Sequence, residues 1–355
     1  MDELLLERIH FTAKAGLSRK QVVKLLLSAG WPEKLVKRYV QKAFKEVAKG
    51  DALQVRNVGK SFGANTVLEG VDFDVRSGEI FGLIGMSGAG KTTLLNILVG
   101  ALSPDSGDVL VAMPDGSSAS VRKEPVKARR MFGFSTQSPS FYDRLTVREN
   151  LEHFARLYGL QKEDARRRAL AVMDLVGLGS ARDIEASKLS GGMQKRLDIA
   201  CALIHDPSIL VLDEPTADLD PIMRKNLWQL MRDINVKGTT IILASHFLAE
   251  IELLCSRIAI LNSSRIVDIG SAKDLRNVYA RNFNLYVQTF SQDYSRLLRA
   301  LGKDARIEGG ELVLNTSKPK RALSIIAKVL LEGDVASVNL SRPSLGEVFE
   351  KVVGR

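Results

Sequence analysis

The sequence has few cysteines and no long apolar run, and each shortage excludes a class of protein. Only two cysteines occur among 355 residues, Cys201 and Cys255, far apart and each within an apolar helical pattern. We therefore expect reduced, buried thiols rather than a disulfide framework or a metal site. The best candidate for a membrane-spanning helix, residues 80–102, is interrupted by Ser87, Lys91 and five glycines. Such a helix needs about 18 or more consecutive apolar residues, so we expect no membrane span.

The sequence also lacks the features of secretion and of nucleic-acid binding. Asp2 and Glu3 stand where a secretory signal would carry positive charge, so we expect a cytoplasmic protein. Lys and Arg outnumber Asp and Glu by 51 to 41, and the first fifty residues hold eleven of the former against five of the latter. The aromatic residues of this basic segment have the spacing of core positions, so no nucleic-acid partner is expected.

Hydrophobic patterns divide the chain into three parts. Residues 1–50 predict a small helical accessory module, which we expect to dock elsewhere, near anionic lipid headgroups. Residues 52–272 alternate short strands and helices, which is typical of an α/β domain with a largely parallel core sheet. Residues 282–355 favour a small α+β domain of the split-βαβ kind. Its expected elements are a strand at 283–289, a helix at 293–301, strands at 305–307 and 311–315, a helix at 318–331, a strand at 336–340 and a last helix from Ser344.

A glycine-rich segment has the spacing of a phosphate-binding loop. Residues 85–92 read Gly-Met-Ser-Gly-Ala-Gly-Lys-Thr, between an apolar strand pattern and an apolar helix pattern. In such a loop the backbone N–H groups and the helix N-terminus point at phosphate oxygens. Lys91 would reach the terminal phosphates, and the Thr92 hydroxyl would ligate Mg²⁺. The residues predicted to contact the nucleotide here are Gly85, Ser87, Gly88, Ala89, Gly90, Lys91, Thr92 and Thr93.

Two adjacent carboxylates follow a second apolar run. Residues 209–212 are Ile-Leu-Val-Leu, and Asp213 and Glu214 come next. Such a run predicts a central strand buried on both faces, and ionised carboxylates at its end need a cation or a proton. A Mg²⁺–nucleotide complex supplies the cation. Asp213 would hold the metal through its water shell, and Glu214 would polarise the attacking water.

Between these elements, residues 189–194 read Leu-Ser-Gly-Gly-Met-Gln. With this segment, residues 52–272 resemble the ATP-binding subunits of ABC transporters, whose signature motif is Leu-Ser-Gly-Gly-Gln or a close variant. The resemblance implies a P-loop NTPase fold with a helical signature subdomain. It also implies roles for further residues. Phe62 would stack on adenine, Gln137 would sense Mg²⁺, and Ser190, Gly191 and Gly192 would bind the ATP of a second subunit. Asp220 would lie in a loop that crosses the dimer, and His246 would be a switch histidine that contacts the terminal phosphate.

The resemblance further implies how such a protein works. Two chains would sandwich two ATP molecules head to tail, as a homodimer or with a related subunit, and hydrolysis would release them. We expect Lys91, Glu214 and His246 to be catalytic, and Thr92, Gln137 and Asp213 to be the Mg²⁺ site. The ATPase would power a separate membrane permease from the inner face of the cell membrane, with the surface around Phe141, Tyr142 and Leu145 receiving the permease.

One departure from the common pattern and one further similarity indicate a subfamily. Met193 stands where many members carry glutamine, and residues 342–349 read Arg-Pro-Ser-Leu-Gly-Glu-Val-Phe. Both features are similar to subunits that pair with ABC-2-type permeases, so an exporter is favoured over an importer.

Two other interpretations remain open. The chain could be a soluble ABC ATPase acting on ribosomes or DNA, although it has neither a second cassette nor a long coiled-coil insertion. The C-terminal domain could also be a small-molecule sensor that regulates the ATPase.

Overall fold

The computed structural model describes residues 50–279, 282–302, 305–330 and 335–353, together with the helical residues Val23, Leu26, Leu27, Leu35 and Val36. The rest of the predicted helical module of residues 1–50 lies outside the described residues, except Gly50. The chain forms two compact units, residues 1–268 and 269–355. In the part of the chain that is described, no helix has the length and apolar character needed to cross a membrane.

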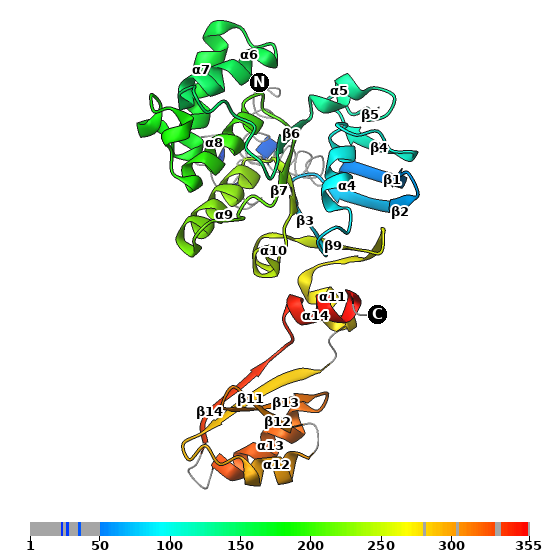
Figure 1. The fold of residues 1–355 in the computed structure, drawn as a ribbon, viewed down its shortest axis with the longest axis vertical. Helices are drawn as coiled ribbons and strands as arrows, with labels where there is room; N and C mark the ends of the chain where they lie inside the picture. Colours follow the sequence, from blue (N-terminus) through cyan, green and yellow to red (C-terminus); the bar gives the residue numbers. More distant parts are fainter. Residues whose placement is uncertain are drawn as a thin grey trace. The chain divides into compact units, whose positions relative to one another are not determined.

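A six-stranded sheet forms the centre of the first unit (Figure 1). Its order is β10-β9-β3-β8-β7-β6, and the strands from β9 to β6 are parallel. The strands are β3 (Ile80–Gly85), β6 (Phe132–Ser135), β7 (Ile209–Asp213), β8 (Thr240–Ala244), β9 (Arg257–Asn262) and β10 (Arg265–Gly270). Every residue of β3, β7 and β8 is buried, which explains their uninterrupted apolar sequences. The predicted α/β fold with a parallel core sheet is confirmed.

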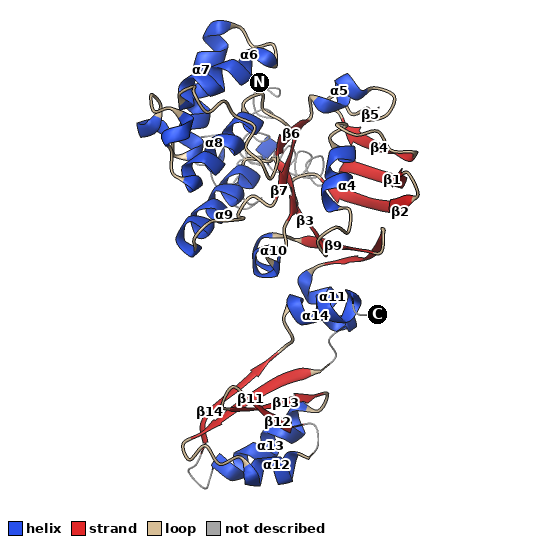
Figure 2. Ribbon diagram, in the orientation of Figure 1, coloured by secondary structure: helices blue, strands red, loops and turns tan. Residues whose placement is uncertain are grey.

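A second, antiparallel sheet of the first unit was not predicted from the sequence. It has the order β2-β1-β4-β5, formed by β1 (Asp51–Phe62), β2 (Asn65–Arg76), β4 (Ser106–Ala112) and β5 (Ser118–Ser120). β1 and β2 form a long hairpin, whereas β4 joins β1 from beyond the phosphate loop and its helix. In the view of Figure 2, this sheet and helices α6–α9 lie on opposite sides of the parallel strands.

Helices surround the parallel sheet and build the expected helical signature subdomain. The helices are α4 (Lys91–Leu98), α5 (Pro125–Arg129), α6 (Val147–Leu157), α7 (Lys162–Val176), α8 (Gly191–Leu203), α9 (Pro221–Val236) and α10 (Leu248–Leu254). Two short 3₁₀ turns, Gly179–Ala181 and Ala186–Lys188, separate α7 from α8. α6, α7 and α8 pack on one another and form the subdomain. Cys201 in α8 and Cys255 after α10 are free and buried, as expected, and burial raises the pKa of both thiols.

The second unit contains a four-stranded antiparallel sheet of order β12-β13-β11-β14. Its elements are α11 (Ala272–Tyr279), β11 (Phe283–Thr289), α12 (Ser295–Leu301), β12 (Ala305–Glu308), β13 (Glu311–Thr316), α13 (Pro319–Leu330), β14 (Val335–Ser341) and α14 (Leu345–Val353). From β11 onward, this is the order of elements expected from the sequence. Apolar side chains of β11, β13, α12 and α13 share one core, including Leu285, Leu297, Leu312 and Ile326.

The C-terminal sequence motif has a clear structural role in this unit. The Ser344 hydroxyl accepts a bond from the backbone N–H of Glu347, and Glu347 Oε1 accepts one from the N–H of Ser344, which caps α14. The other oxygen of Glu347 accepts from the Asn284 amide of β11 at 2.8 Å. Arg342 donates to Asn277 Oδ1 in α11 at 2.8 Å. The motif therefore attaches α14 to β11 through Glu347, and the segment between β14 and α14 to α11 through Arg342.

Candidate active site

The ends of four parallel strands bring the predicted catalytic elements to one edge of the sheet. The phosphate loop follows β3, Asp213 ends β7, His246 lies two residues beyond β8, and Gln137 lies two residues beyond β6. These strands are parallel neighbours in the order β3-β8-β7-β6, so their carboxyl ends share one edge. In open α/β sheets this edge is where ligands bind.

The phosphate loop, residues 85–92, curls around the side chain of its lysine. Lys91 Nζ donates to the carbonyl oxygens of Gly85 at 3.0 Å and Met86 at 3.2 Å. Gly90, with φ near 100°, is the N-cap of α4, so the loop turns directly into the helix. The loop thus presents an ammonium group and a positive helix N-terminus together, which suits a phosphate chain. The remaining predicted residues lie in the loop or in the first turn of α4, exposed or half-buried: Ser87, Gly88, Ala89, Thr92 and Thr93.

Asp213 provides a test of whether this site fits a metal ion. Thr92 Oγ1 donates to Asp213 Oδ2 at 2.8 Å, while the buried Oδ1 has no hydrogen-bond partner among the described residues. Burial raises the pKa of Asp213, and the Thr92 hydroxyl opposes this effect. A buried carboxylate oxygen without a partner is costly unless a cation approaches it. Since a carboxylate and phosphates are ligands that Mg²⁺ prefers, these residues fit a Mg²⁺–nucleotide complex.

Glu214 and His246 are in direct contact. Glu214 Oε2 accepts from the backbone N–H of His246 at 3.2 Å and lies 2.7 Å from His246 Nδ1. Glu214 has a φ of 51°, and its N–H donates to Ala244 O at 2.9 Å, so the carboxylate turns toward the end of β8. More than half of the His246 side chain, 57%, is exposed. In this pair, Glu214 is therefore anchored, and His246 is open to a ligand.

Gln137 lies on a loop that α8 holds from two positions. Lys195 Nζ donates to the carbonyl oxygen of Gln137 at 2.9 Å, while the Gln137 residue itself is exposed. Asp198, fully buried, accepts from the Ser135 hydroxyl and from both the N–H and the hydroxyl of Ser140, the latter two at 2.8 and 2.7 Å. Both ends of the loop around Gln137 are thus attached to the helix that begins at the signature motif.

Phe62 lies at the turn end of the β1–β2 hairpin, where it pairs with Asn65. Phe62 is 52% exposed, and Lys60 Nζ lies 5.5 Å from its ring centroid. Val67 of β2 borders Gly90, since a Cβ on that glycine would lie 3.0 Å from Val67 O. The hairpin therefore brings an exposed aromatic side chain to the region of the phosphate loop.

The signature residues form a separate helix N-terminus. Ser190 caps α8 by accepting from the N–H of Met193 at 3.4 Å, and Gly191 has open space around it. Gly192 packs on Met223 of α9, a helix that Asp220 caps by accepting from two backbone N–H groups. Among the residues described, no hydrogen bond joins Ser190, Gly191, Gly192 or Asp220 to the phosphate loop of the same chain. The structure thus gathers Lys91, Thr92, Asp213, Glu214 and His246 at one sheet edge, and it places the signature residues at a separate helix N-terminus.

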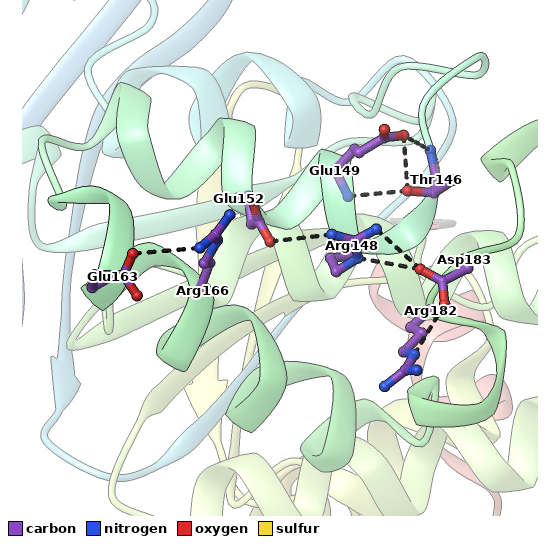
Figure 3. Close-up of polar contacts among 8 residues, drawn as sticks. All are labelled: Thr146, Arg148, Glu149, Glu152, Glu163, Arg166, Arg182 and Asp183. Atoms are coloured by element: carbon purple, nitrogen blue, oxygen red, sulfur yellow. Dashed lines mark hydrogen bonds and ion pairs between the residues drawn. The ribbon is translucent and has the colours of Figure 1, made fainter.

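Polar contacts attach the start of α6 to the segment that leads into the signature motif (Figure 3). Thr146 and Glu149 form a capping box, and Arg148 Nη2 lies 3.1 Å from Asp183 Oδ1. The backbone N–H groups of Val147 and Arg148 donate to the carbonyl oxygens of Ile184 and Arg182. Three residues of this region are expected to receive a permease. Tyr142 is exposed, Leu145 is half-buried and Phe141 is buried.

Comparison with known proteins gives the family. The ABC transporter family profile matches residues 68–217. The linearmycin resistance ATP-binding protein LnrL of Bacillus subtilis (strain 168) is 31% identical over 312 residues, which are 85% of this chain and 98% of that protein. The Nod factor export ATP-binding protein I of Rhizobium sp. (strain N33) is 35% identical over 308 residues, 86% of this chain and 97% of that protein.

The chain belongs to the ABC transporter ATP-binding proteins. Solved structures agree with this assignment. The ATP-binding subunit of an ABC transporter superposes with a TM-score of 0.57 at 31% identity, over 64% of this chain and 93% of that one. A dimeric ATP-binding cassette, in a post-hydrolysis state with ADP and Pi, superposes with a TM-score of 0.55 at 27% identity, over 62% and 98% of the two chains. The protein is therefore an ABC ATPase that binds and hydrolyses ATP.

Three polar residues of this ABC ATPase site were missed from the sequence. Lys195 and Asp198 lie in α8, and a charged residue in a helix is normally solvent-exposed. Glu250 lies in α10, yet it is fully buried and accepts three hydrogen bonds. One signal could have found Glu250: it lies three and four residues from Phe247 and Leu254, on the apolar face of its helix.

Proposed function

We propose that this protein is the ATP-hydrolysing subunit of an exporter, with an ABC-2-type membrane permease as its partner. The observation that carries the proposal is that one sheet edge brings together Lys91, Thr92, Asp213, Glu214 and His246. Ser190 caps a separate helix. The relatives' names, Nod factor export and linearmycin resistance, favour transport over a role on ribosomes or DNA. Met193 and the motif at residues 342–349 support the ABC-2 type.

In this proposal the chain's residues position and stabilise the transferring phosphoryl group. Lys91 would bind the terminal phosphates, and Thr92, Asp213 and Gln137 would hold Mg²⁺. The bound Mg²⁺ supplies positive charge that offsets the charge on the phosphate oxygens. Glu214 orients and polarises the attacking water, and His246, held by Glu214, contacts the terminal phosphate. Phe62 stacks on the adenine.

The signature residues complete the site of a second copy. Ser190, Gly191 and Gly192 bind the phosphates of ATP held on the partner's phosphate loop, and Asp220 lies at the interface. The exposed N-terminus of α8 supports this role because a helix N-terminus favours anions and no phosphate loop of its own chain lies in hydrogen-bond contact with it, as far as the described residues show. ATP therefore joins the two subunits, and its hydrolysis separates them.

The permease docks on the helical subdomain beside Tyr142. This exposed ring packs on His153, with centroids 5.0 Å apart, and on Phe154 at 6.1 Å. The neighbouring contacts of Arg148 with Asp183 connect the same surface to the chain leading to Ser190. The protein would thus act in the cytoplasm, at the inner face of the membrane through its permease.

A tagged Glu214→Gln chain tests the function. We expect turnover to fall by about 10²- to 10⁴-fold, the usual contribution of a general base, with nucleotide binding retained. Because Glu214→Gln should hold ATP without hydrolysing it, the variant should stay in its ATP-bound state. When it is purified from native membranes in detergent with Mg-ATP, a membrane protein with several spanning helices should co-purify with it. Unchanged turnover would refute the role of Glu214, and recovery of ribosomes or DNA in place of a permease would support the alternative function.

Cysteine crosslinking in the same Glu214→Gln background tests the dimer. Chains carrying only Ser87→Cys are mixed with chains carrying only Gly191→Cys, so that a crosslink between these positions requires two molecules. Both sites can accept the change, since Ser87 is exposed and a Cβ on Gly191 meets nothing within 4 Å. The native Cys201 and Cys255 are buried and should not compete. An ATP-dependent crosslinked dimer is expected; a crosslink found only within one chain of the Ser87→Cys, Gly191→Cys double variant would refute the head-to-tail arrangement.

A further inference from the structure

Glu250 of α10 is fully buried and accepts hydrogen bonds from three different segments of the first unit. Its Oε2 accepts from the Thr216 hydroxyl at 2.7 Å and from the Ser245 hydroxyl at 2.9 Å. Its Oε1 accepts from Trp228 Nε1 at 3.0 Å. Thr216 follows β7, Ser245 follows β8 and Trp228 lies in α9. One carboxylate therefore connects elements that are otherwise separate in the chain.

Two of these three partners lie next to the residues proposed to act on the attacking water. Thr216 is two residues after Glu214, and Ser245 directly precedes His246. The Ser245 hydroxyl is held on both sides, since it donates to Glu250 and accepts from the N–H of Phe247 at 3.1 Å. Both ends of the Glu214–His246 contact therefore lie on loops that converge on Glu250.

The third partner extends the connection to the interface helix. Trp228 lies in α9, which begins directly after Asp220. An indole N–H can only donate, so the half-buried Trp228 is satisfied by an acceptor such as the Glu250 carboxylate. The two hydroxyls can donate or accept, so a carboxylate or an amide could both satisfy the three partners, whereas an aliphatic side chain could satisfy none. Burial raises the pKa of Glu250, and its three donors oppose this effect.

We propose that Glu250 is a positioning residue for ATP hydrolysis, which fixes the loop carrying Glu214 and the loop carrying His246 relative to each other. The inference rests on the roles proposed above for Glu214 and His246. Glu250 has no hydrogen bond to Lys91 or Thr92 in the described part of the chain, so its loss should affect the chemical step more than ATP binding. Misplacement of reacting groups by about 1 Å can cost about 10²-fold in rate.

The test compares Glu250→Ala, Glu250→Gln and the wild-type full chain in steady-state ATPase and nucleotide-binding assays. Glu250→Ala should lower kcat by about 10- to 100-fold, with the ATP Kd changed less than about threefold. Glu250→Gln should keep kcat within about threefold of wild type, because its amide can accept from Trp228 and donate to the two hydroxyls. Equal kcat values for Glu250→Ala and wild type would overturn the proposal, as would an equal loss in Glu250→Gln and Glu250→Ala.

Glu79→Ala is the matched control for losing a buried glutamate. The Glu79 side chain is 9% exposed and is bonded to Arg257 and to the N–H of Arg76. It precedes β3, at the end of the strand opposite to the phosphate loop. We expect this variant to lose thermal stability while its folded fraction keeps the wild-type kcat. A similar fall of kcat in Glu79→Ala and Glu250→Ala would show a general effect of destabilisation and overturn the positioning role.

A double-mutant cycle separates positioning from stability. In a His246→Ala background, Glu250→Ala should lower kcat less than about threefold, because residues acting through one contact are not additive. The same loss in both backgrounds would contradict the proposal.

If Glu250→Ala does not fold, Thr216→Val and Ser245→Ala each remove one donor, and wild-type kcat in both would overturn it. If kcat falls in Glu214→Gln but not in Glu250→Ala, only the positioning role of Glu250 is refuted. If kcat is unchanged in Glu214→Gln, the proposed mechanism itself is refuted.

Discussion

Alanine at Gly90 should damage the phosphate loop more than alanine at Gly88, although the two glycines are two residues apart. Gly90 has φ +100°, and a Cβ there would lie 3.0 Å from both Val67 O and Val67 Cγ1 and 3.1 Å from Leu68 Cδ2. Gly88 has φ +79°, and a Cβ there would meet nothing within 4 Å. Both substitutions introduce left-handed strain, but only the one at Gly90 also meets the backbone of β2.

The expected magnitudes follow from these two terms. Left-handed strain costs about 1–2 kcal/mol for a residue with a Cβ. Overpacking adds about 1–3 kcal/mol at Gly90, since Val67 O belongs to a paired strand and cannot rotate away. We expect Gly88→Ala to lower the free energy of unfolding by about 1–2 kcal/mol and Gly90→Ala by about 2–5 kcal/mol.

Urea unfolding of the nucleotide-free protein measures this difference, since bound ATP would add its own stabilisation. ATP titration of the folded variants gives the functional side. Gly90→Ala should also weaken ATP binding, because Gly90 is the N-cap of the helix that faces the phosphates. Equal losses of stability in the two variants would refute the reasoning, because the left-handed term is common to both.

Two further predictions concern buried titratable groups. Asp213→Asn should leave the nucleotide-free protein at least as stable, because burial raises the pKa of Asp213 and so disfavours its charged form, yet it should raise the Mg²⁺ needed for half-maximal hydrolysis about 10- to 100-fold. A lower Tm with an unchanged Mg²⁺ requirement would contradict this. His205 stacks on Tyr158 and lies 3.0 Å from Phe132 O, and burial lowers its pKa to about 4. Because the unfolded ring titrates near 6.5, stability present above that pH should be lost as pH falls toward 4, by at most about 3 kcal/mol. Urea melts of wild type and His205→Asn from pH 7.5 to 4.5 should show this loss in the wild type alone, and parallel curves would count against it.

The sequence by itself determined the elements whose signals are local. The spacing from Gly85 to Thr92, and the apolar run before Asp213, each lie within about eight residues and predict strand ends with phosphate and metal chemistry. The elements from β11 to α14 were also predicted in order, because strand and helix periodicities differ and each element shows its own period. Five residues that the structure gathers at one sheet edge, Lys91, Thr92, Asp213, Glu214 and His246, came from such patterns or from the resemblance they support.

Only the tertiary structure decided which distant segments meet. β4 joins β1 across the whole phosphate loop and α4, a pairing that no local pattern specifies. The bonds of Glu250 to Thr216 and of Asp198 to Ser135 span 34 and 63 residues of sequence. A buried acidic side chain and an exposed one have the same letter in the sequence, and what separates them is the set of donors that folding brings around the carboxylate. The same reason explains why Asp213 could be predicted as a metal ligand, while its unpaired buried oxygen became visible only once β3, β8 and β7 lay side by side.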